Sequence, residues 1–452
     1  WGMTLDQNPS PDPSPKRRGE EEKSFRPLSA SGRGLGHGVL RKPRIAWVSP
    51  APPSETGIAD YAAEVATVLS DRFDIEWVTD PRAPAPVAAV AAKYRCLTSA
   101  GYDARHAARP FDLPVYHVGN NVFHVYALEL MQRHPGLVVV HDAHLGGLFR
   151  TAADAGVWPT DVPAELEHNG EPLLADWVRR GLVHPHAVPT LSPLNRRVLE
   201  QAAAVVVHSG YGWQLARKVT DAPVSLVPLF AEGPATPLDP AAERRRLGLP
   251  ADRFVVASLG FVGPPKRLEV MVRAAGRLPA AVKDRTLVLS VGPCPEVFRT
   301  QLLTLAEEVG LAGRVEIRGK APLSDFAAYS VGADACVQLR FPSNGETSAA
   351  LYRALAAGAA CVVSDTGSMA ELPNDVVLKV RSPARDADDL AAALTRLATE
   401  PDLRGRLSAA AARFATATCN REAVAAGYAA AISNARAVLA DRTSVAASQS
   451  AA

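Results

Sequence analysis

Short apolar runs alternate with helical patterns along most of the chain. In the first half, apolar runs of strand length occupy 45–48, 73–79, 113–118, 136–142, 203–209 and 224–228. A second series occupies 254–260, 286–292, 314–319, 333–339 and 360–365. Strands that are apolar on both faces and connected through helices are typical of parallel sheets covered by helices. The pattern therefore predicts an α/β protein with two tandem Rossmann-like domains that face each other across a cleft.

The same pattern sets the expected boundaries. A chain of 452 residues is too long for one ordinary core and suits two domains with tails. Pro, Ser, Gly and opposed charges dominate 1–42, so a disordered leader is predicted there, and small residues predict a disordered tail at 439–452. The predicted parts between them are a first domain (43–230), a linker (231–250), a second domain (251–417) and a last helix (418–438).

Composition narrows the class of protein. The formal net charge is +2, which gives no electrostatic argument for a nucleic-acid partner. The five cysteines are scattered and form no C-x-x-C pair, so neither a disulfide framework nor a zinc knuckle is indicated. No apolar run approaches the roughly 20 residues of a membrane-spanning helix, and no signal-peptide core is present. We expect a cytoplasmic protein, with peripheral contact to the inner face of a membrane left open.

Ligands of open α/β sheets bind outside the carboxyl ends of the strands, so candidate residues are those that follow strands. In the second domain, a Gly- and Pro-rich loop after 254–260 leads to Lys266, which is expected at the first turn of the next helix. A cation there makes sense if an anion binds beside it. A polar loop that follows 333–339 carries hydroxyl groups and free backbone N–H groups suited to phosphate or ribose oxygens. A third loop, 364–373, opens on the same rim.

Polar residues also follow the strands of the first domain. Gly57 lies in the loop SETGIADY between the first strand and a helix, where a helix N-terminus favours anions. The segment 117–121 and the pair His141 and Asp142 follow two further strands, and His208 follows another. Because three histidines fall on one rim, at least one is a candidate for the site.

These motifs resemble the retaining, nucleotide-sugar-dependent glycosyltransferases of the GT-B fold, family 4. The resemblance covers roughly 43–438 and is carried by PPSETGIADY, VVVHD, VVVHS, GFVGPPK, PSNGETSAALYRALAAG and SDTGSMAEL in that order. It implies that the second domain holds a nucleotide diphosphate sugar, the first binds the acceptor, and the last helix crosses back to the first domain. The expected activity is transfer of a hexosyl group to a glycan or lipid-linked acceptor with retention, in polysaccharide biosynthesis and without a metal cofactor.

The resemblance also implies roles for single residues. Lys266 would bind the diphosphate, and Gly57 would let the backbone approach the distal phosphate. His141 would lie beside the transferred sugar. Glu346 would act near the sugar, and these implications make His141, Glu346 and Lys266 the catalytic candidates. The remaining donor-binding candidates are Gly263, Arg340, Asn344, Thr347, Ser348 and Glu371, and the acceptor-binding candidates are Asn120, Asn121 and His124.

Two departures from the family pattern keep other interpretations open. The family has a second glutamate at the position where this chain has Arg353, and the spacing from Glu346 to that position is one residue shorter than usual. The family also commonly has an arginine at the position where this chain has Phe261. One alternative is a catalytically inactive nucleotide-sugar-binding relative. A second is a metal-dependent hydrolase that uses His117, His124, His141, Asp142 and His144 as ligands. A third is an epimerase of similar fold, which would need no acceptor.

Overall fold

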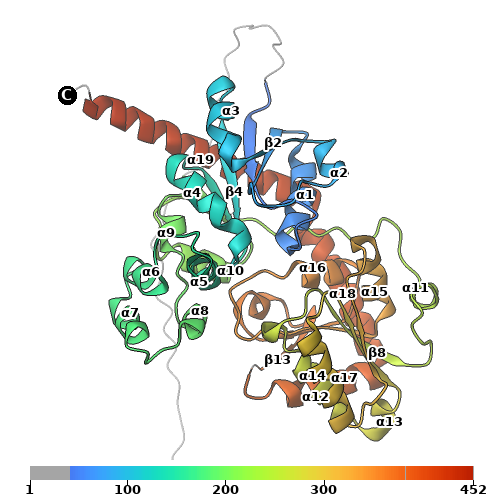
Figure 1. Cartoon of the computed structure of the whole chain (residues 1–452). Helices are drawn as coiled ribbons and strands as arrows, with labels where there is room; N and C mark the ends of the chain where they lie inside the picture. Colours follow the sequence, from blue (N-terminus) through green and yellow to red (C-terminus); the bar gives the residue numbers. More distant parts are fainter. Residues whose placement is uncertain (1–40, 382, 451–452) are drawn as a thin grey trace, which may run out of the picture. The chain divides into compact units, whose positions relative to one another are not determined.

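The computed structural model describes residues 41–381 and 383–450, and the chain from Lys42 onward forms one compact unit (Figure 1). The leader predicted over 1–42 lies outside the described residues except for its last two positions. The predicted architecture is confirmed, because the chain forms two all-parallel sheets covered by helices.

The first sheet has seven strands in the order β3-β2-β1-β4-β5-β6-β7. The inner strand β1 pairs with β2 and β4, which places Trp47 opposite Trp77 and Val115. The edge strand β3 was not predicted, since its four residues are exposed or half-buried and carry no continuous apolar run. The strands are β1 (Arg44–Val48), β2 (Asp74–Thr79), β3 (Arg95–Thr98), β4 (Leu113–Val118), β5 (Leu137–Val140), β6 (Ala204–Val207) and β7 (Val224–Leu226).

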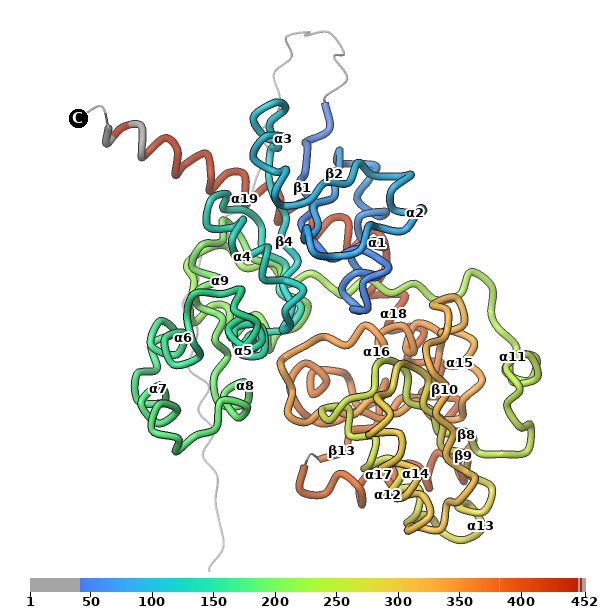
Figure 2. The backbone as a smooth tube through the Cα atoms, in the orientation of Figure 1, coloured from blue at the N-terminus to red at the C-terminus, as the bar shows by residue number. Residues whose placement is uncertain are grey.

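Ten α-helices lie between β1 and β7 in the described part of the chain. Between β5 and β6 the chain inserts five of them, α5 to α9, and Figure 2 shows this green stretch as a group of short helices beside the sheet. The helices are α1 (Gly57–Leu69), α2 (Ala88–Ala91), α3 (Tyr102–Ala108), α4 (Val125–Arg133), α5 (Gly146–Asp154), α6 (Val162–His168), α7 (Pro172–Arg179), α8 (Val188–Leu191), α9 (Arg196–Leu199) and α10 (Gly210–Ala216).

The second sheet has six strands in the order β10-β9-β8-β11-β12-β13. Its strands are β8 (Phe254–Leu259), β9 (Thr286–Val291), β10 (Val315–Arg318), β11 (Ala335–Gln338), β12 (Cys361–Ser364) and the unpredicted edge strand β13 (Val377–Val380). The helices are α11 (Pro240–Arg246), α12 (Leu268–Gly276), α13 (Ala280–Lys283), α14 (Glu296–Glu308), α15 (Phe326–Gly332), α16 (Ala349–Ala356), α17 (Asp386–Thr399) and α18 (Pro401–Thr418).

The connection between the sheets is shorter than the predicted linker over 231–250. Asp239 caps α11, the short helix expected in this stretch, and Gly248 ends it in the left-handed conformation at φ 63°. Arg244 on this helix donates from Nε to the carbonyl of Gly332 at 2.7 Å and pairs with Asp334. These contacts make α11 part of the second domain.

The last helix, α19 (Arg421–Ser450), belongs to the core of the first domain. Val424, Tyr428 and Ile432 are buried in the same cluster as β1 and α1, and the Tyr428 hydroxyl lies 3.4 Å from that of Tyr61. The disordered tail predicted over 439–452 is wrong up to Ser450, because the helix continues that far. Alanine-rich sequence without Gly or Pro has high helix propensity, which the prediction from residue size neglected.

By length and composition, the helical stretch Pro401–Val445 meets a criterion for a membrane span, with a best window of mean hydropathy 1.2 that is 33% buried. A buried core helix meets the same criterion, and α18 and α19 both contribute to the domain cores. The finding is therefore weak evidence for a span.

Candidate functional site

A cavity of roughly 550 Å³ opens where the carboxyl ends of both sheets meet. Its volume is in the range of ordinary ligand sites. We call it the cleft. Its walls come from the loops after β1, β5, β8, β9 and β11 and include Gly57, Asp60, Tyr61, Asn121, His141, Asp142, Gly260, Lys266, Gly292, Arg340, Glu346, Thr347, Ser348 and Arg353.

The first wall of the cleft is the start of α1. Thr56 caps this helix by accepting a hydrogen bond from the backbone N–H of Ile58 at 3.3 Å. Gly57 is the first helical residue, and a Cβ atom built on it would meet nothing within 4 Å. The backbone at this helix start is therefore open to the cleft, as the prediction for Gly57 requires.

Close approach of two strand ends forms the second wall. Gly292, after β9, has φ 148°, and a Cβ atom on it would lie 2.1 Å from the carbonyl oxygen of Gly260, after β8. Only glycine fits there. The two loops therefore meet backbone to backbone and leave room above them for a ligand.

Lys266 lies beside these glycines, in a 3₁₀ turn (Pro264–Lys266) rather than in the first turn of α12 as predicted. The following residue, Arg267, is left-handed at φ 54° and pairs with Asp386 at 2.6 Å. The ammonium group of Lys266 makes no hydrogen bond or ion pair within the described residues. Burial, and secondarily the nearby Arg340, hold the pKa of Lys266 well below its usual value. An anion in the cleft would supply the missing partner.

Arg340 and Glu346 form the floor of the cleft. Arg340 is 5% exposed, and its Nε donates to Glu346 Oε1 at 2.7 Å. Its Nη1 donates to the carbonyl of Leu339, and its backbone N–H donates to Ser364 Oγ at 2.9 Å. The guanidinium is therefore fixed in place. Burial lowers the pKa of Arg340, while Glu346 acts in the opposite direction.

Glu346 lies before the next helix rather than in its first turn. The helix that follows, α16, begins at Ala349 with Ser348 as its cap. The second carboxylate oxygen of Glu346 accepts from the backbone N–H of Asn344 at 2.8 Å and from Ser343 Oγ at 3.2 Å. Glu346 thus joins the polar loop to Arg340.

Three histidines line up at the ends of β4, β5 and β6. His141 Nε2 lies 2.9 Å from Nδ1 of the fully buried His117. His208 lies with its ring 5.3 Å from that of His141, and Tyr61 contacts both rings at 5.2 and 5.4 Å. Burial holds the pKa of His117 and His141 well below the usual range and lowers that of His208 to about 4. These three imidazoles are therefore neutral near pH 7.

Asp142, next to His141, carries an unusual carboxyl group. Burial, with the nearby Glu346 as the second cause, raises the pKa of Asp142 from 3.8 to about 7. Its Oδ2 accepts from the backbone N–H of Asn120 at 2.7 Å. The carboxyl group is therefore partly protonated near neutral pH.

Five predicted site residues lie outside the cleft lining. Asn120 Oδ1 accepts from the backbone N–H of Leu148 at 2.9 Å, and the buried His124 contacts the carbonyl of His117. The backbone carbonyl of Asn344 accepts a hydrogen bond from the backbone N–H of His144 at 2.8 Å. Both carboxylate oxygens of Glu371 accept from the backbone N–H groups of Gly210 and Tyr211 at the start of α10. These four residues and Gly263 form the frame around the cleft.

Arg353 and Phe261, the two departures from the family pattern, both lie at the cleft. Arg353, on α16, pairs through Nη2 with Glu64 Oε2 on α1 at 2.8 Å and also lines the cleft. Phe261, after β8, is 59% exposed. Arg353 thus connects the two domains at the mouth of the cleft. Its pairing with a first-domain carboxylate could not be read from spacing alone.

Cleft residues that the sequence analysis did not select include Asp60, Tyr61 and Gly292. Asp60 and Tyr61 lie within SETGIADY, the loop singled out for Gly57, and the signal for Gly292 was its place after a strand. Within the described ranges, no group of three or more His, Cys, Asp and Glu side chains could hold a metal ion.

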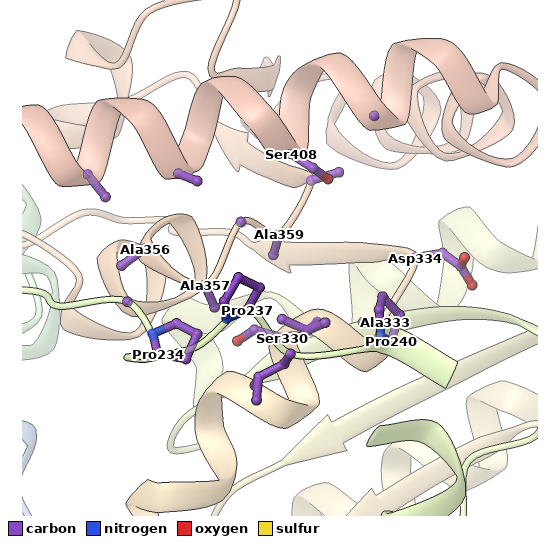
Figure 3. A pocket seen from close by; sticks show the side chains of 18 of the residues that line it. Pro234, Pro237, Pro240, Ser330, Ala333, Asp334, Ala356, Ala357, Ala359 and Ser408 are labelled. Atoms are coloured by element: carbon purple, nitrogen blue, oxygen red, sulfur yellow. The ribbon is translucent and has the colours of Figure 1, made fainter. Parts of the chain in front are cut away.

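A larger cavity of roughly 1190 Å³ lies between residues 231–241 and the second domain (Figure 3). Proline and alanine side chains such as Pro234, Pro237, Ala357 and Ala359 dominate its walls. Two carboxylates line it and both are paired, Asp334 with Arg244 and Arg404 and Glu232 with Arg421. Fixed polar groups that could orient a ligand are therefore few there, and the cleft is the better candidate site.

Comparison with known proteins agrees with this architecture. Residues 239–414 match the family model described as glycosyl transferases group 1. Curated relatives include the D-inositol 3-phosphate glycosyltransferase of Thermobispora bispora, 34% identical over 186 residues that cover 40% of this chain and 43% of the relative. The enzyme of the same name from Thermomonospora curvata is 32% identical over 179 residues, covering 38% and 41%. The chain therefore matches less than half the length of these relatives.

Two solved structures show the same fold. Sucrose-phosphate synthase from Thermosynechococcus elongatus has a TM-score of 0.61 and 20% identity, covering 85% of this chain and 96% of its own. Anabaena HepE in complex with UDP-glucose has a TM-score of 0.62 and 14% identity, covering 86% and 99%.

The class of protein follows from these findings and from the two parallel sheets. The chain has the GT-B fold, with two Rossmann-like domains that meet at a cleft. Residues 239–414, within the second domain, match the family model of glycosyl transferases group 1. The predicted resemblance is confirmed at this level, whereas the assignment to family 4 and the roles of single residues stay predictions.

Proposed function

We propose that this chain is a glycosyltransferase that moves a hexosyl group from a nucleotide diphosphate sugar to a hydroxyl of a glycan or lipid-linked acceptor, with retention at the anomeric carbon. The observation that carries the proposal is that the ammonium group of Lys266 lines the cleft beside the fixed Arg340 and has no ion-pair partner among the residues that the structure describes. Cleavage of the anomeric C–O bond leaves negative charge on the departing diphosphate. Fixed cations and backbone N–H groups aimed at that charge lower the barrier.

The two sides of the cleft have different parts in this proposal. Lys266 and the helix start at Gly57 hold the diphosphate, while Thr347 and Ser348 offer hydrogen bonds to the donor. His141 and Glu346 contact the hydroxyls of the sugar. The acceptor enters from the first domain, where Asn121 lines the cleft. Asn120 and His124 act indirectly, by supporting Asp142 and His117.

Other proteins support the donor class. Anabaena HepE has been solved with UDP-glucose, and its fold is the fold of this chain. The printed name of the curated relatives adds D-inositol 3-phosphate as an acceptor to be tried beside glycans and lipid-linked sugars. We further propose that the reaction takes place in the cytoplasm and that the protein needs no metal cofactor.

The test is transfer activity in a panel of UDP- and GDP-hexoses with these acceptors, with and without EDTA. The expected result is one donor base, unchanged activity in EDTA, and a product whose anomeric configuration by NMR equals that of the donor. Lys266→Ala serves as the matched inactive control. Donor binding without turnover would replace the proposal with the inactive nucleotide-sugar-binding relative, and loss of activity in EDTA would favour metal chemistry.

A further inference from the structure

The histidine pair at the ends of β4 and β5 has a geometry that the proposed roles do not use. The ring centroids of His117 and His141 lie 5.2 Å apart with an angle of 22° between the ring planes. With Nδ1 of His117 only 2.9 Å from Nε2 of His141, the rings meet edge to edge and nearly in one plane. This geometry suits a direct hydrogen bond between two imidazoles.

Neighbouring carbonyls fix two other histidines and show what the pair lacks. His124 Nδ1 faces the carbonyl of His117, and His208 Nδ1 faces the carbonyl of Val227, both at 2.9 Å. A carbonyl only accepts, so each of these histidines carries its proton on Nδ1. No carbonyl fixes His141. Its Nε2 has His117 as partner, and its Nδ1 makes no hydrogen bond within the part of the chain that the structure describes.

One proton lies between the two rings, because burial keeps both imidazoles neutral. Either His117 donates to His141, or His141 donates to His117. In both cases Nε2 of His117 stays buried without a partner. If His141 donates, that nitrogen is an orphaned N–H, which folded proteins tolerate less well than an unused acceptor. Donation from His117 is therefore the favoured arrangement.

We propose that His117 is a positioning residue for the sugar-binding side of the cleft: it donates Nδ1–H to His141 Nε2 and so fixes His141 as the tautomer with a proton on Nδ1. His141 then presents an N–H donor to an oxygen of the transferred sugar. The ring of Trp47, 4.4 Å from that of His117, and the buried setting of His117 hold the donor in place. This inference rests on the proposed function only for the identity of the ligand.

The direct experiment is long-range ¹H–¹⁵N NMR of protein labelled at histidine, which distinguishes a protonated ring nitrogen from an unprotonated one. Wild-type His141 is expected to carry its proton on Nδ1, and His208, fixed by Val227, is the internal reference. A proton on Nε2 of His141 in the wild type would overturn the proposal without any need for a variant.

Variants then separate the hydrogen bond from the shape of the side chain. His117→Asn places an amide N–H near the position of Nδ1, whereas His117→Leu has no donor. The leucine variant is expected to lose the single tautomer of His141 and about tenfold in kcat, the scale at which outer partners of an active imidazole act, with KM for the donor sugar nearly unchanged. The asparagine variant is expected to keep the tautomer and most of kcat.

The control is His168→Asn, since His168 lies on α6 and pairs with Glu200 outside the cleft. Equal loss of kcat in the asparagine and leucine variants, or an unchanged His141 tautomer in His117→Leu, would contradict the positioning role. If no transfer is found with any acceptor, the proposed function fails, whereas the tautomer of His141 is still measured by NMR.

Discussion

The cleft has two sides that differ in charge, although each is built from the ends of parallel strands. The second-domain side carries Lys266, Arg340 and Glu346, while the first-domain side carries the neutral His141 and the carboxyl groups of Asp60 and Asp142. A departing diphosphate needs positive charge, whereas sugar hydroxyls need neutral donors and acceptors. The difference suggests that the second domain stabilises the departing diphosphate, whereas the first domain contacts the sugar.

The largest expected effect comes from replacing Lys266 on the second-domain side, whose side chain has no partner in the described part of the chain. Lys266→Ala should lower kcat at least about a hundredfold, as removal of a group that stabilises developing negative charge does elsewhere. Lys283→Ala, on α13 and outside the cleft, should leave steady-state kinetics unchanged. Urea unfolding should show that both variants keep the wild-type fold. A Lys266→Ala enzyme with normal turnover would remove the charged side from the mechanism.

Arg340→Met is expected to have the next largest effect, on stability. The side chains of Arg340 and Glu346 are only 6% and 17% exposed, so the variant leaves a largely buried carboxylate without its cation. The expected loss is about 3 kcal/mol of unfolding free energy in urea. The double variant Arg340→Met with Glu346→Leu should recover most of it. Equal stability of the single variant and the wild type would show that the pair is solvated.

Glu346→Gln keeps the shape of the side chain and removes its charge. Turnover is expected to fall about tenfold, through weaker contact with the sugar hydroxyls and a less firmly held Arg340. Steady-state kinetics over a range of donor concentrations measures the effect, and a thermal melt within a few degrees of wild type controls for folding. Unchanged kinetics would reduce Glu346 to a structural member of its loop.

On the first-domain side, Asp142 predicts a pH dependence of stability. Its pKa is raised in the folded state from 3.8 to about 7, so between these values the folded protein binds more protons than the unfolded chain. Its contribution to stability therefore falls as pH rises through that window, by at most about 1.4 kcal/mol per pH unit, and is lost above pH 7. Asp142→Asn should remove this slope in unfolding measured from pH 5 to 8. The same slope in both proteins would contradict the raised pKa.

The smallest effects concern the ion pairs that join the two sides. Arg353 and Glu64 are 15% and 31% exposed in their side chains, while Lys320 and Glu55 are 63% and 70% exposed. A double-mutant cycle to alanine should give up to about 1 kcal/mol of coupling for the first pair and close to zero for the second. Equal coupling would mean that burial at the mouth of the cleft has no influence.

Much of this arrangement could be predicted from the chain alone. Apolar runs located eleven of the strands, and the residues just after them include His141, Lys266 and Arg340, because parallel strands bring their carboxyl ends to one edge. The edge strands β3 and β13 escaped prediction because they are short and partly exposed. Side-chain partners are set by tertiary packing. The contact of Glu371 with the start of α10 and the contact of His117 with His141 could therefore be found only in the structure.

The central claim is that Lys266 on the second-domain side holds the nucleotide diphosphate, together with the helix start at Gly57, and that His141 on the first-domain side does not. Isothermal titration of UDP and GDP into the wild type, Lys266→Ala and His141→Ala tests it most directly. The account predicts that one of the two nucleotides binds, that Lys266→Ala weakens this binding at least about tenfold, and that His141→Ala leaves it unchanged. Weakening by His141→Ala with no effect of Lys266→Ala would contradict it.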